Sequence, residues 1–324
     1  MKTIFVTGGC GFIGSNFLLH WAQQYPDWRL VNLDVMSYAA NIENLAELEH
    51  HPNYQFLKDD INHLTMNKKV LCHFQPDYIV HFAAESHVDR SIESSGPFVK
   101  NNVMGTVNFL DSVRFYMKKV SKDFRFLHVS TDEVFGSLRE YDEPFTELSQ
   151  YAPNSPYSAS KAASDHFVRS YYHTHGVPAI VTNCSNNYGP RQHKEKFIPT
   201  VIRHALEDKP IPVYGNGMNI RDWLWVDDHC TALETLLLHG QVGEQYCIGG
   251  DNEVANIDLA KRILDIMGKP QSLISYVTDR AGHDFRYAIN SKKLKSLGWR
   301  ANMTFTQGLE RTINWYLQHP ERLQ

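Results

Sequence analysis

The feature that most constrains this chain is a glycine-rich turn near its start. The turn follows an uncharged apolar run at Thr3–Thr7, reads Thr-Gly-Gly-Cys-Gly-Phe-Ile-Gly over residues 7–14, and leads into an apolar stretch at Phe17–Trp21. A strand, a glycine turn and a helix in this order let the backbone turn tightly and present amide groups and the positive end of a helix to phosphate. The sequence therefore predicts an α/β unit that binds a phosphate-bearing ligand.

An acidic residue follows this turn at the spacing of a dinucleotide site. Asp34 lies 20 residues after Gly14, at the end of the next predicted strand. A carboxylate at this place accepts hydrogen bonds from the adenosine ribose diol and repels a 2′-phosphate. Neither Val35 nor Met36 supplies an arginine. The pattern favours NAD over NADP, and a purely structural glycine turn with an exposed aspartate is the alternative.

Apolar runs and amphipathic stretches alternate along the chain. Continuous apolar runs are typical of strands buried on both faces, so the predicted fold is α/β, a Rossmann-like doubly wound parallel sheet with a smaller substrate-binding lobe. The predicted strands are Thr3–Thr7, Leu30–Asp34, Tyr54–Leu57, Tyr78–Ala83, Phe124–Ser130 and Ala179–Asn183. Helices are predicted in the second half at Phe197–Glu207, Asp227–His239, Ile257–Met267 and Thr306–Leu317.

The length of 324 residues fits two domains. We predict an NAD-binding domain at residues 1–183 with a returning segment near 218–255, and a smaller substrate-binding lobe at residues 184–217 and 256–324.

Composition excludes several other classes of protein. The net charge of −4 argues against a surface that binds nucleic acid non-specifically. Glycines interrupt the apolar start, which argues against a signal peptide, and no apolar run is long enough to span a membrane. Five scattered cysteines without a CxxC pair favour a reducing, cytoplasmic location. The 17 histidines include no HExxH motif, so no metal site is predicted.

A second motif places a tyrosine and a lysine one helical turn apart. Tyr157 and Lys161 follow Pro156 at the start of a predicted helical stretch, and residues four apart share a helix face. A nearby ammonium group favours the phenolate and so lowers the pKa of a tyrosine from its ordinary value of about 10. Tyr157, assisted by Lys161, is therefore the candidate general base for a sugar hydroxyl.

A hydroxyl and two acids, Thr131, Asp132 and Glu133, follow the fifth predicted strand. This is the sheet edge where ligands bind in a doubly wound fold. Two neighbouring carboxylates in a dehydrated cleft do not both ionise readily, so one can act as an acid and the other as a base. That combination suits the elimination of water. A solvated turn with two ordinary acids is the alternative.

These motifs resemble the dTDP-glucose 4,6-dehydratases, NAD-dependent members of the extended short-chain dehydrogenases/reductases. The resemblance extends nearly from end to end. It also rests on Phe-Ala-Ala-Glu-Ser-His-Val-Asp-Arg-Ser at 82–91, Ser-Pro-Tyr-Ser-Ala-Ser-Lys at 155–161, Asn-Asn-Tyr-Gly-Pro at 186–190, Gly-Asn-Gly at 215–217, Ile-Arg-Asp-Trp at 220–223 and Asp-Arg-Ala-Gly-His-Asp at 279–284.

The resemblance implies a redox-neutral conversion of dTDP-glucose to dTDP-4-keto-6-deoxyglucose, for a 6-deoxyhexose pathway. Tyr157 would take the C4 hydroxyl proton as hydride passes to NAD. Glu133 would then remove the C5 proton, Asp132 would protonate the departing C6 hydroxyl, and Thr131 would steady charge on the C4 oxygen. The hydride would return to C6, a proton would be added back at C5, and NAD would be regenerated without leaving.

The same resemblance, joined to the glycine turn, assigns the remaining site residues. The predicted cofactor contacts are Gly8, Gly11, Phe12, Ile13, Gly14, Asp34, Ser37, Asp60, Ile61, Ala83, Ala84, Asn101, Tyr157, Lys161 and Asn187. The predicted substrate contacts are Ser86, Thr131, Asn186, Lys196, Phe197, Pro212, Val213, Tyr214, Arg221, Asn256, Arg280 and His283.

Three alternatives stay open at this point. Arg191, His193 and Lys194 stand in a loop where the family usually has Tyr, Phe and Pro, so the same reaction on UDP-glucose instead of dTDP-glucose is the first alternative. An epimerase or decarboxylase of the same fold would not need the acid pair, and a silent NAD-binding protein would not need the tyrosine and lysine.

The family also implies a homodimer packed through long helices. The candidate faces are Met104–Met117 and Ser164–His173. Ordinary packing of these faces against the sheet is the alternative.

Overall fold

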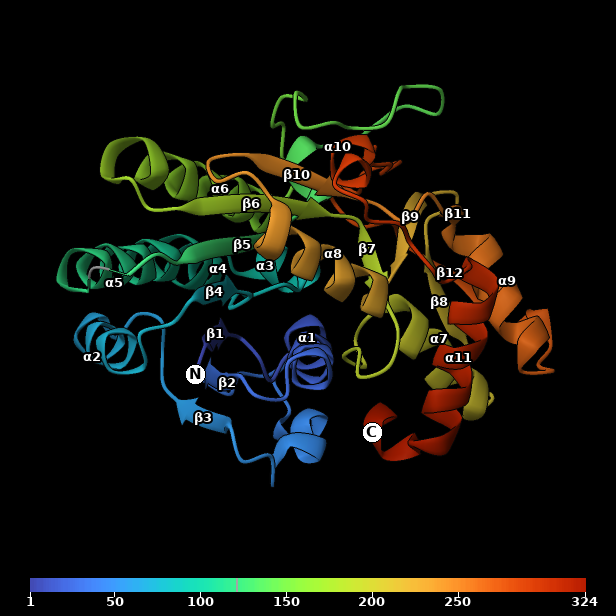
Figure 1. Cartoon of the computed structure of the whole chain (residues 1–324). Helices are drawn as coiled ribbons and strands as arrows, with labels where there is room; N and C mark the ends of the chain where they lie inside the picture. Colours follow the sequence, from blue (N-terminus) through green and yellow to red (C-terminus); the bar gives the residue numbers. More distant parts are fainter. Residues whose placement is uncertain (121) are drawn as a thin grey trace.

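A seven-stranded parallel sheet forms the centre of the larger part of the molecule (Figure 1). In this computed structural model, which describes residues 1–120 and 122–324, the strands lie in the order β3-β2-β1-β4-β5-β6-β10. Their bounds are β1 Thr3–Thr7, β2 Arg29–Asp34, β3 Tyr54–Lys58, β4 Tyr78–His81, β5 Arg125–Thr131, β6 Ala179–Cys184 and β10 Gln245–Ile248. The order reverses between β1 and β4, where ligands bind in such sheets. The predicted Rossmann-like fold is confirmed.

Helices cover both faces of this sheet, as the continuous apolar strands predict. On one face Phe17 and Trp21 pack in the same core as Leu233 and Leu236. The other face buries Phe109 and its neighbours. The helices are α1 Phe12–Gln24 and α8 Val226–His239 on the first face, and α2 Leu64–Phe74, α5 Thr106–Lys119 and α6 Pro156–His175 on the second.

A smaller lobe lies at the right of Figure 1 around a separate hydrophobic core. A three-stranded sheet has the order β11-β9-β7, and β8 pairs with β12. The strands are β7 Asn186–Tyr188, β8 Ile211–Tyr214, β9 Ile220–Trp225, β11 Glu253–Ala255 and β12 Ile274–Val277, and the helices are α7 Phe197–Leu206, α9 Asn256–Ile266 and α11 Phe305–Gln318.

In the predicted returning segment near 218–255, β10 is a strand of the large sheet and α8 packs against that sheet. The strands β9 and β11 of this segment belong to the three-stranded sheet. The domain boundaries themselves stay a prediction. Short helices complete the chain: η1 Ile42–Leu48, α3 Val88–Glu93, α4 Gly96–Phe98, η2 Val99–Gly105, η3 Asp132–Phe135, η4 Gln271–Leu273, α10 Lys292–Ser296 and η5 Pro320–Leu323.

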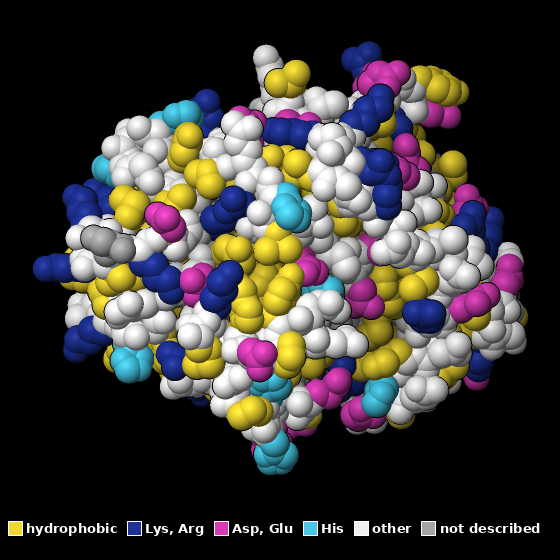
Figure 2. Space-filling model, viewed as in Figure 1, with side chains coloured by type: hydrophobic (Ala, Val, Ile, Leu, Met, Phe, Trp, Pro, Cys, Tyr) yellow, Lys and Arg dark blue, Asp and Glu magenta, His cyan; other side chains and the backbone are white. Residues whose placement is uncertain are grey.

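The surface carries mixed charge. Figure 2 shows basic and acidic side chains interspersed over one face, with no continuous basic stripe there. No helix in the described part of the chain is long and apolar enough to cross a membrane.

Candidate active site

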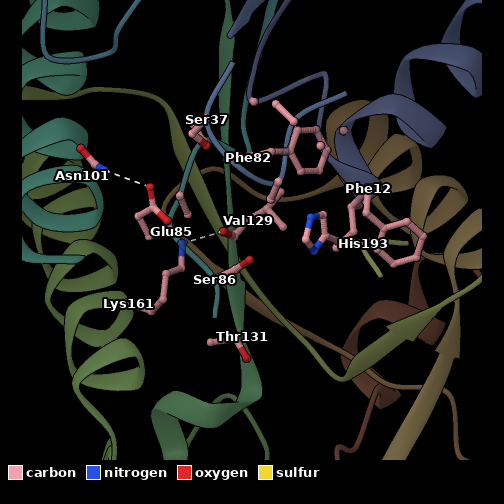
Figure 3. A pocket seen from close by; sticks show the side chains of 18 of the residues that line it. Phe12, Ser37, Phe82, Glu85, Ser86, Asn101, Val129, Thr131, Lys161 and His193 are labelled. Carbon is pink, nitrogen blue, oxygen red and sulfur yellow. Dashed lines mark hydrogen bonds between the residues drawn. The ribbon is translucent and has the colours of Figure 1, made fainter. Parts of the chain in front are cut away.

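A cavity of about 470 Å³ opens at the carboxyl edge of the large sheet. Its walls include residues at or just after the ends of five strands: Gly8 after β1, Asp34 in β2, Phe82 after β4, Thr131 in β5 and Cys184 in β6. The carboxyl ends of parallel strands meet at one edge, which explains why residues so far apart in sequence line one cavity. In Figure 3, Asn101 and Lys161 lie on one side of the cavity, and Phe12 and His193 lie on the other.

The glycine turn fits a phosphate for steric reasons. Gly8 has a φ of 72°, and a Cβ there would lie 2.7 Å from the backbone nitrogen of Ala83. A Cβ at Gly14 would lie 2.4 Å from the carbonyl oxygen of Gly8. Gly11 precedes α1 without any side-chain cap. The first amides of α1 therefore remain available to an anion at the positive end of the helix.

Asp34 is held rigidly at the far end of this turn. Its Oδ2 accepts a hydrogen bond from the Cys10 amide at 2.9 Å, and its Oδ1 accepts one from the Met36 amide at 2.8 Å. Burial raises the pKa of the carboxyl group, while these two amides lower it. The side chain lines the cavity, so its remaining lone pairs can accept hydrogen bonds from a ribose.

The tyrosine and the lysine lie at the start of α6, as predicted. Ser155 caps this helix by accepting a hydrogen bond from the Ser158 amide at 3.0 Å. Tyr157 and Lys161 both line the cavity. The ammonium group of Lys161 donates a hydrogen bond to the carbonyl of Val129 at 2.9 Å, shown as a dashed line in Figure 3.

The expected fall in the pKa of Tyr157 does not occur in the protein alone. Burial raises the pKa of Tyr157 well above 10, and the nearby Glu133 carboxylate raises it further. The Thr131 hydroxyl acts in the opposite direction. The prediction considered only the nearby ammonium group and omitted desolvation, which is the larger effect here. Tyr157 is therefore a neutral phenol until a ligand changes its surroundings.

The two acids occupy different environments although they are neighbours in sequence. Asp132 is 1% exposed, and burial together with Glu133 and Asp222 raises its pKa well above its ordinary value. Burial also raises the pKa of Glu133, but Lys196 and two arginines oppose the shift. Asp132 is thus suited to hold a proton, and Glu133 is the better candidate to lose one.

Hydrogen bonds tie the acid pair to the tyrosine helix. Thr131 Oγ1 donates to Asp132 Oδ1 at 3.3 Å and accepts a hydrogen bond from the Glu133 amide at 3.2 Å. The hydroxyl of Ser158 donates to Glu133 Oε2 at 3.3 Å. The end of β5 and the start of α6 therefore form one polar cluster.

Several buried polar atoms in the cavity wall have no hydrogen-bond partner within the described chain. Buried polar groups are rarely left without partners, so these atoms point to a ligand or to water. They are Ser130 Oγ, Asp132 Oδ2, Ser185 Oγ, Asn186 Oδ1 and Gln192 Oε1. Together with the uncapped helix and Asp34, they make a cavity that fits a dinucleotide and a polar substrate.

All the predicted cofactor and catalytic residues line this cavity. Of the predicted substrate residues, Ser86, Thr131, Asn186 and Lys196 line it as well. The others lie in the small lobe outside the wall: Phe197, Pro212, Val213, Tyr214, Arg221, Asn256, Arg280 and His283. Val213 is 1% exposed in the lobe core, so its side chain cannot reach a ligand from this position.

Two arginines of the lobe are already held by protein groups. Arg221 donates to the carbonyl of Asp284 at 3.0 Å and lies over the ring of Tyr287. Arg280 pairs with Asp89 at 2.7 Å. Both arginines oppose the rise in the pKa of Glu133, so their charges act on the acid pair without lining the cavity.

The cavity also contains residues that were not predicted. Glu85 accepts a hydrogen bond from Asn101 at 3.2 Å, and the rings of His193 and Tyr38 lie nearly perpendicular with their centroids 5.6 Å apart. The sequence could have indicated Glu85 through its position just after β4, and His193 through its position in the loop that departs from the family pattern. The full set is Leu33, Val35, Ala39, Ala40, Asp59, Phe82, Glu85, Lys100, Val129, Ser130, Cys184, Ser185, Gln192 and His193. Among the described residues, no group of three or more metal-ligating side chains gathers as a metal site.

Comparison with known proteins gives a consistent result. A family model described as GDP-mannose 4,6 dehydratase matches residues 5–312. A dTDP-glucose 4,6-dehydratase from Xanthomonas campestris pv. campestris is 51% identical, covering 100% of this chain and 95% of the relative. A dTDP-glucose 4,6-dehydratase from Streptomyces venezuelae, solved with NAD bound, superposes with a TM-score of 0.93 at 42% identity, covering 99% of this chain and 98% of the other.

Epimerases of the same fold are more distant. A UDP-glucuronic acid 4-epimerase from Bacillus cereus superposes with a TM-score of 0.90 at only 26% identity, covering 98% of this chain and 100% of the other. The fold is thus shared widely, whereas high identity over the whole chain is shared with the dehydratases. The chain belongs to the dTDP-glucose 4,6-dehydratase family of extended short-chain dehydrogenases/reductases.

Proposed function

We propose that this protein is an NAD-dependent dTDP-glucose 4,6-dehydratase that forms dTDP-4-keto-6-deoxyglucose. The observation that carries the proposal is the acid pair. Asp132 and Glu133 lie beside Tyr157 in the cavity that also contains the glycine turn. One site thus contains an acid, Asp132, and two bases, Glu133 and Tyr157. This combination suits the loss of water next to an oxidised carbon.

The cofactor half of the cavity would hold NAD through this chain's own groups. The amides after Gly11 would meet the pyrophosphate, and Asp34 would accept hydrogen bonds from the adenosine ribose. Asp60 and Ile61 follow β3 at the adenine end. When bound, NAD would supply the acceptor for the C4 hydride and the donor of that hydride to C6, and a proton added back at C5 would complete the product.

Tyr157 would take the proton of the C4 hydroxyl in the first step. Its pKa is high in the protein alone, so the step requires positive charge near the phenol. Lys161 already contributes positive charge from the same face of α6, and a bound ligand would have to add to it. Thr131 can donate a hydrogen bond to the C4 oxygen.

Asp132 and Glu133 would carry out the elimination. Oxidation at C4 acidifies the C5 proton, which the Glu133 carboxylate can remove. The raised pKa of Asp132 keeps a proton available for the departing C6 hydroxyl. The difference in environment between the two acids thus corresponds to the difference in their roles.

Individual lysine and arginine side chains, instead of a continuous basic surface, would bind the diphosphate of the sugar nucleotide. Lys196 lines the cavity, and its ammonium group donates to the carbonyl of Ser86 at 2.9 Å. Arg221 and Arg280 lie in the adjoining lobe. An arginine fork can bind phosphate oxygens in pairs, so Arg280 would exchange Asp89 for the diphosphate.

The proposal is tested by incubating the purified protein with dTDP-glucose or with UDP-glucose and measuring the formation of product. We expect a keto sugar, detected in alkali, and faster turnover of dTDP-glucose. Faster turnover of UDP-glucose would change the assigned nucleotide only. Unchanged substrate, or a C4 epimer without keto product, would contradict the dehydratase assignment.

We also propose that two copies associate through α5 and α6. Met104, Phe115 and Phe167 on or next to these helices are exposed, although each is large and apolar. Methionine and phenylalanine are enriched at interfaces between subunits relative to the rest of a protein surface. Light scattering on the purified protein tests this, and a monomer at micromolar concentration would contradict it.

A cytoplasmic location is proposed from the cysteines. All five are free, and four are buried. Free buried thiols are typical of proteins in a reducing compartment. Cell fractionation tests the proposal.

A further inference from the structure

Lys161 is a buried cation with little to balance its charge nearby. Its side chain is 4% exposed, and its ammonium group donates to one neutral carbonyl, that of Val129, within the described chain. A buried charge is costly unless a counter-charge lies close to it.

Asp165 lies one helical turn after Lys161 on the same face of α6, and it is 3% exposed. Its Oδ2 accepts hydrogen bonds from the Tyr151 hydroxyl at 2.9 Å and from the Asn183 amide at 3.1 Å. Its Oδ1 lies 3.1 Å from His128 Nε2. The loop before α6 and strand β6 therefore hold this carboxylate through its Oδ2, and β5 lies against its Oδ1.

The same carboxylate is connected to the end of β5. The Nδ2 of Asn183 also donates to the carbonyl of Thr131 at 3.0 Å. Gln245 donates to Asn183 Oδ1 at 2.7 Å and so fixes the orientation of that amide. Asp165 thus links the helix of Tyr157 and Lys161 to the strand that ends in Thr131.

The other titratable groups around Lys161 do not supply a negative charge. Burial and Lys161 together lower the pKa of His128 on β5 and of His81 on β4, so both rings are neutral. Burial raises the pKa of the Cys184 thiol on β6 to about 12. On η3, Asp132 and Glu133 act on Tyr157 at the head of the helix. Asp165 is the buried carboxylate on the same face of α6, and it raises the pKa of Lys161 across the intervening turn without a direct ion pair in the described chain.

We propose that Asp165 is a positioning residue of the active site, because it supplies the counter-charge that keeps Lys161 an ammonium ion beside Tyr157. The inference rests on the proposed function for its effect on turnover. The Asp165–Asn183–Thr131 connection holds α6 and the end of β5 in register for the same step.

The test compares Asp165→Asn, which removes the charge and keeps the shape, with Tyr151→Phe, which removes one hydrogen bond and keeps the charge. The kcat for dTDP-glucose is measured against pH on the NAD-loaded protein. Loss of an opposite charge lowers a lysine pKa, so in Asp165→Asn the fall of kcat at alkaline pH should begin about 1 pH unit lower. On that slope its kcat should be about tenfold below that of the wild type.

Tyr151→Phe should keep the alkaline fall at the wild-type pH. An unmoved profile in Asp165→Asn, or an equal shift in both variants, would overturn the inference. An inactive wild type would instead contradict the proposed function.

A second measurement does not depend on activity. The melting temperature is compared for Asp165→Asn, Lys161→Met and the double variant. If the two charges balance each other, the double variant should lose less than the sum of the single losses, and it should fold even if Asp165→Asn alone does not. Additive losses, or a double variant as unfolded as Asp165→Asn, would overturn the inference.

Discussion

The carboxyl edge of the large sheet and the small lobe contribute to one site in different ways. Every predicted cofactor and catalytic residue at the sheet edge lines the cavity. Most predicted substrate residues of the lobe do not, and Arg221 and Arg280 are already held by protein groups. The pairing of the parallel strands fixes the positions of the residues at the sheet edge. In the lobe, the positive charges of Arg221 on β9 and of Arg280 in a loop lie outside the cavity wall.

This difference assigns different effects to the two regions. A substitution at the sheet edge removes a group that is already next to the reacting atoms, so it should reduce kcat. A substitution in the lobe removes a group that would meet the bound nucleotide and that lies outside the cavity wall, so its main effect should be a higher KM.

The largest expected effect is that of Tyr157→Phe. Without the hydroxyl the first proton transfer loses its base, and kcat should fall by about 10²–10⁴-fold. Little reduced nicotinamide should appear, because the reaction stops before C4 oxidation. Rapid-mixing absorbance with dTDP-glucose measures both quantities. The control is Tyr141→Phe at a side chain that is 90% exposed. Normal turnover in Tyr157→Phe would refute the assigned base.

Glu133→Gln should also reduce kcat by at least about 10²-fold, but at a later point in the reaction. The tyrosine step is intact, so C4 oxidation should proceed and reduced nicotinamide should accumulate on the enzyme. Its near-ultraviolet absorbance is the measurement, with the exposed Glu140→Gln as control. If Glu133→Gln accumulated no reduced nicotinamide and resembled Tyr157→Phe, the two roles could not be separated as proposed.

The sequence was sufficient for the sheet edge because periodicity and spacing act there directly. Buried apolar runs place β1, β2 and β5, and the glycine turn, Asp34 and Thr131 follow from where these strands end. Tyr157 follows instead from its spacing to Lys161 at the start of α6. The desolvation of Tyr157 was not visible in the sequence, so the predicted fall in the pKa of Tyr157 was wrong.

Contacts between distant segments were equally out of reach. The Arg280–Asp89 pair and the burial of Val213 depend on how the lobe packs. Motif spacing carries no information on such packing.

Arg280→Gln tests the lobe and should have a smaller effect than either sheet-edge variant. Loss of one charged hydrogen-bond donor to a diphosphate corresponds to about 1.5–3 kcal/mol, or roughly a 10- to 100-fold rise in KM for dTDP-glucose. The kcat should change much less. Steady-state kinetics measures both, and the exposed Arg311→Gln is the control. A fall in kcat with unchanged KM would show that Arg280 acts on the reaction itself. It would contradict the proposed division between kcat effects at the sheet edge and KM effects in the lobe.

The smallest effect concerns the contact that joins the two regions. His229 on α8 is fully buried, and its Nδ1 lies 2.8 Å from the side-chain oxygen of Asn187 on β7. Burial lowers the pKa of His229 from 6.5 to about 3. Between these two pH values the unfolded chain binds a proton that the folded protein does not. The folded state is therefore favoured fully above pH 6.5 and loses stability as the pH falls toward 3.

His229→Gln keeps a donor for Asn187 but does not titrate. At about 1.4 kcal/mol per pH unit, the wild type should lose about 2 kcal/mol more unfolding free energy than this variant between roughly pH 6.5 and 5. Denaturant unfolding at the two pH values measures the difference, with the exposed His50→Gln expected to follow the wild type. Equal losses in wild type and His229→Gln would mean that the histidine is not held neutral, and that the contact between α8 and β7 opens to water more readily than its burial implies.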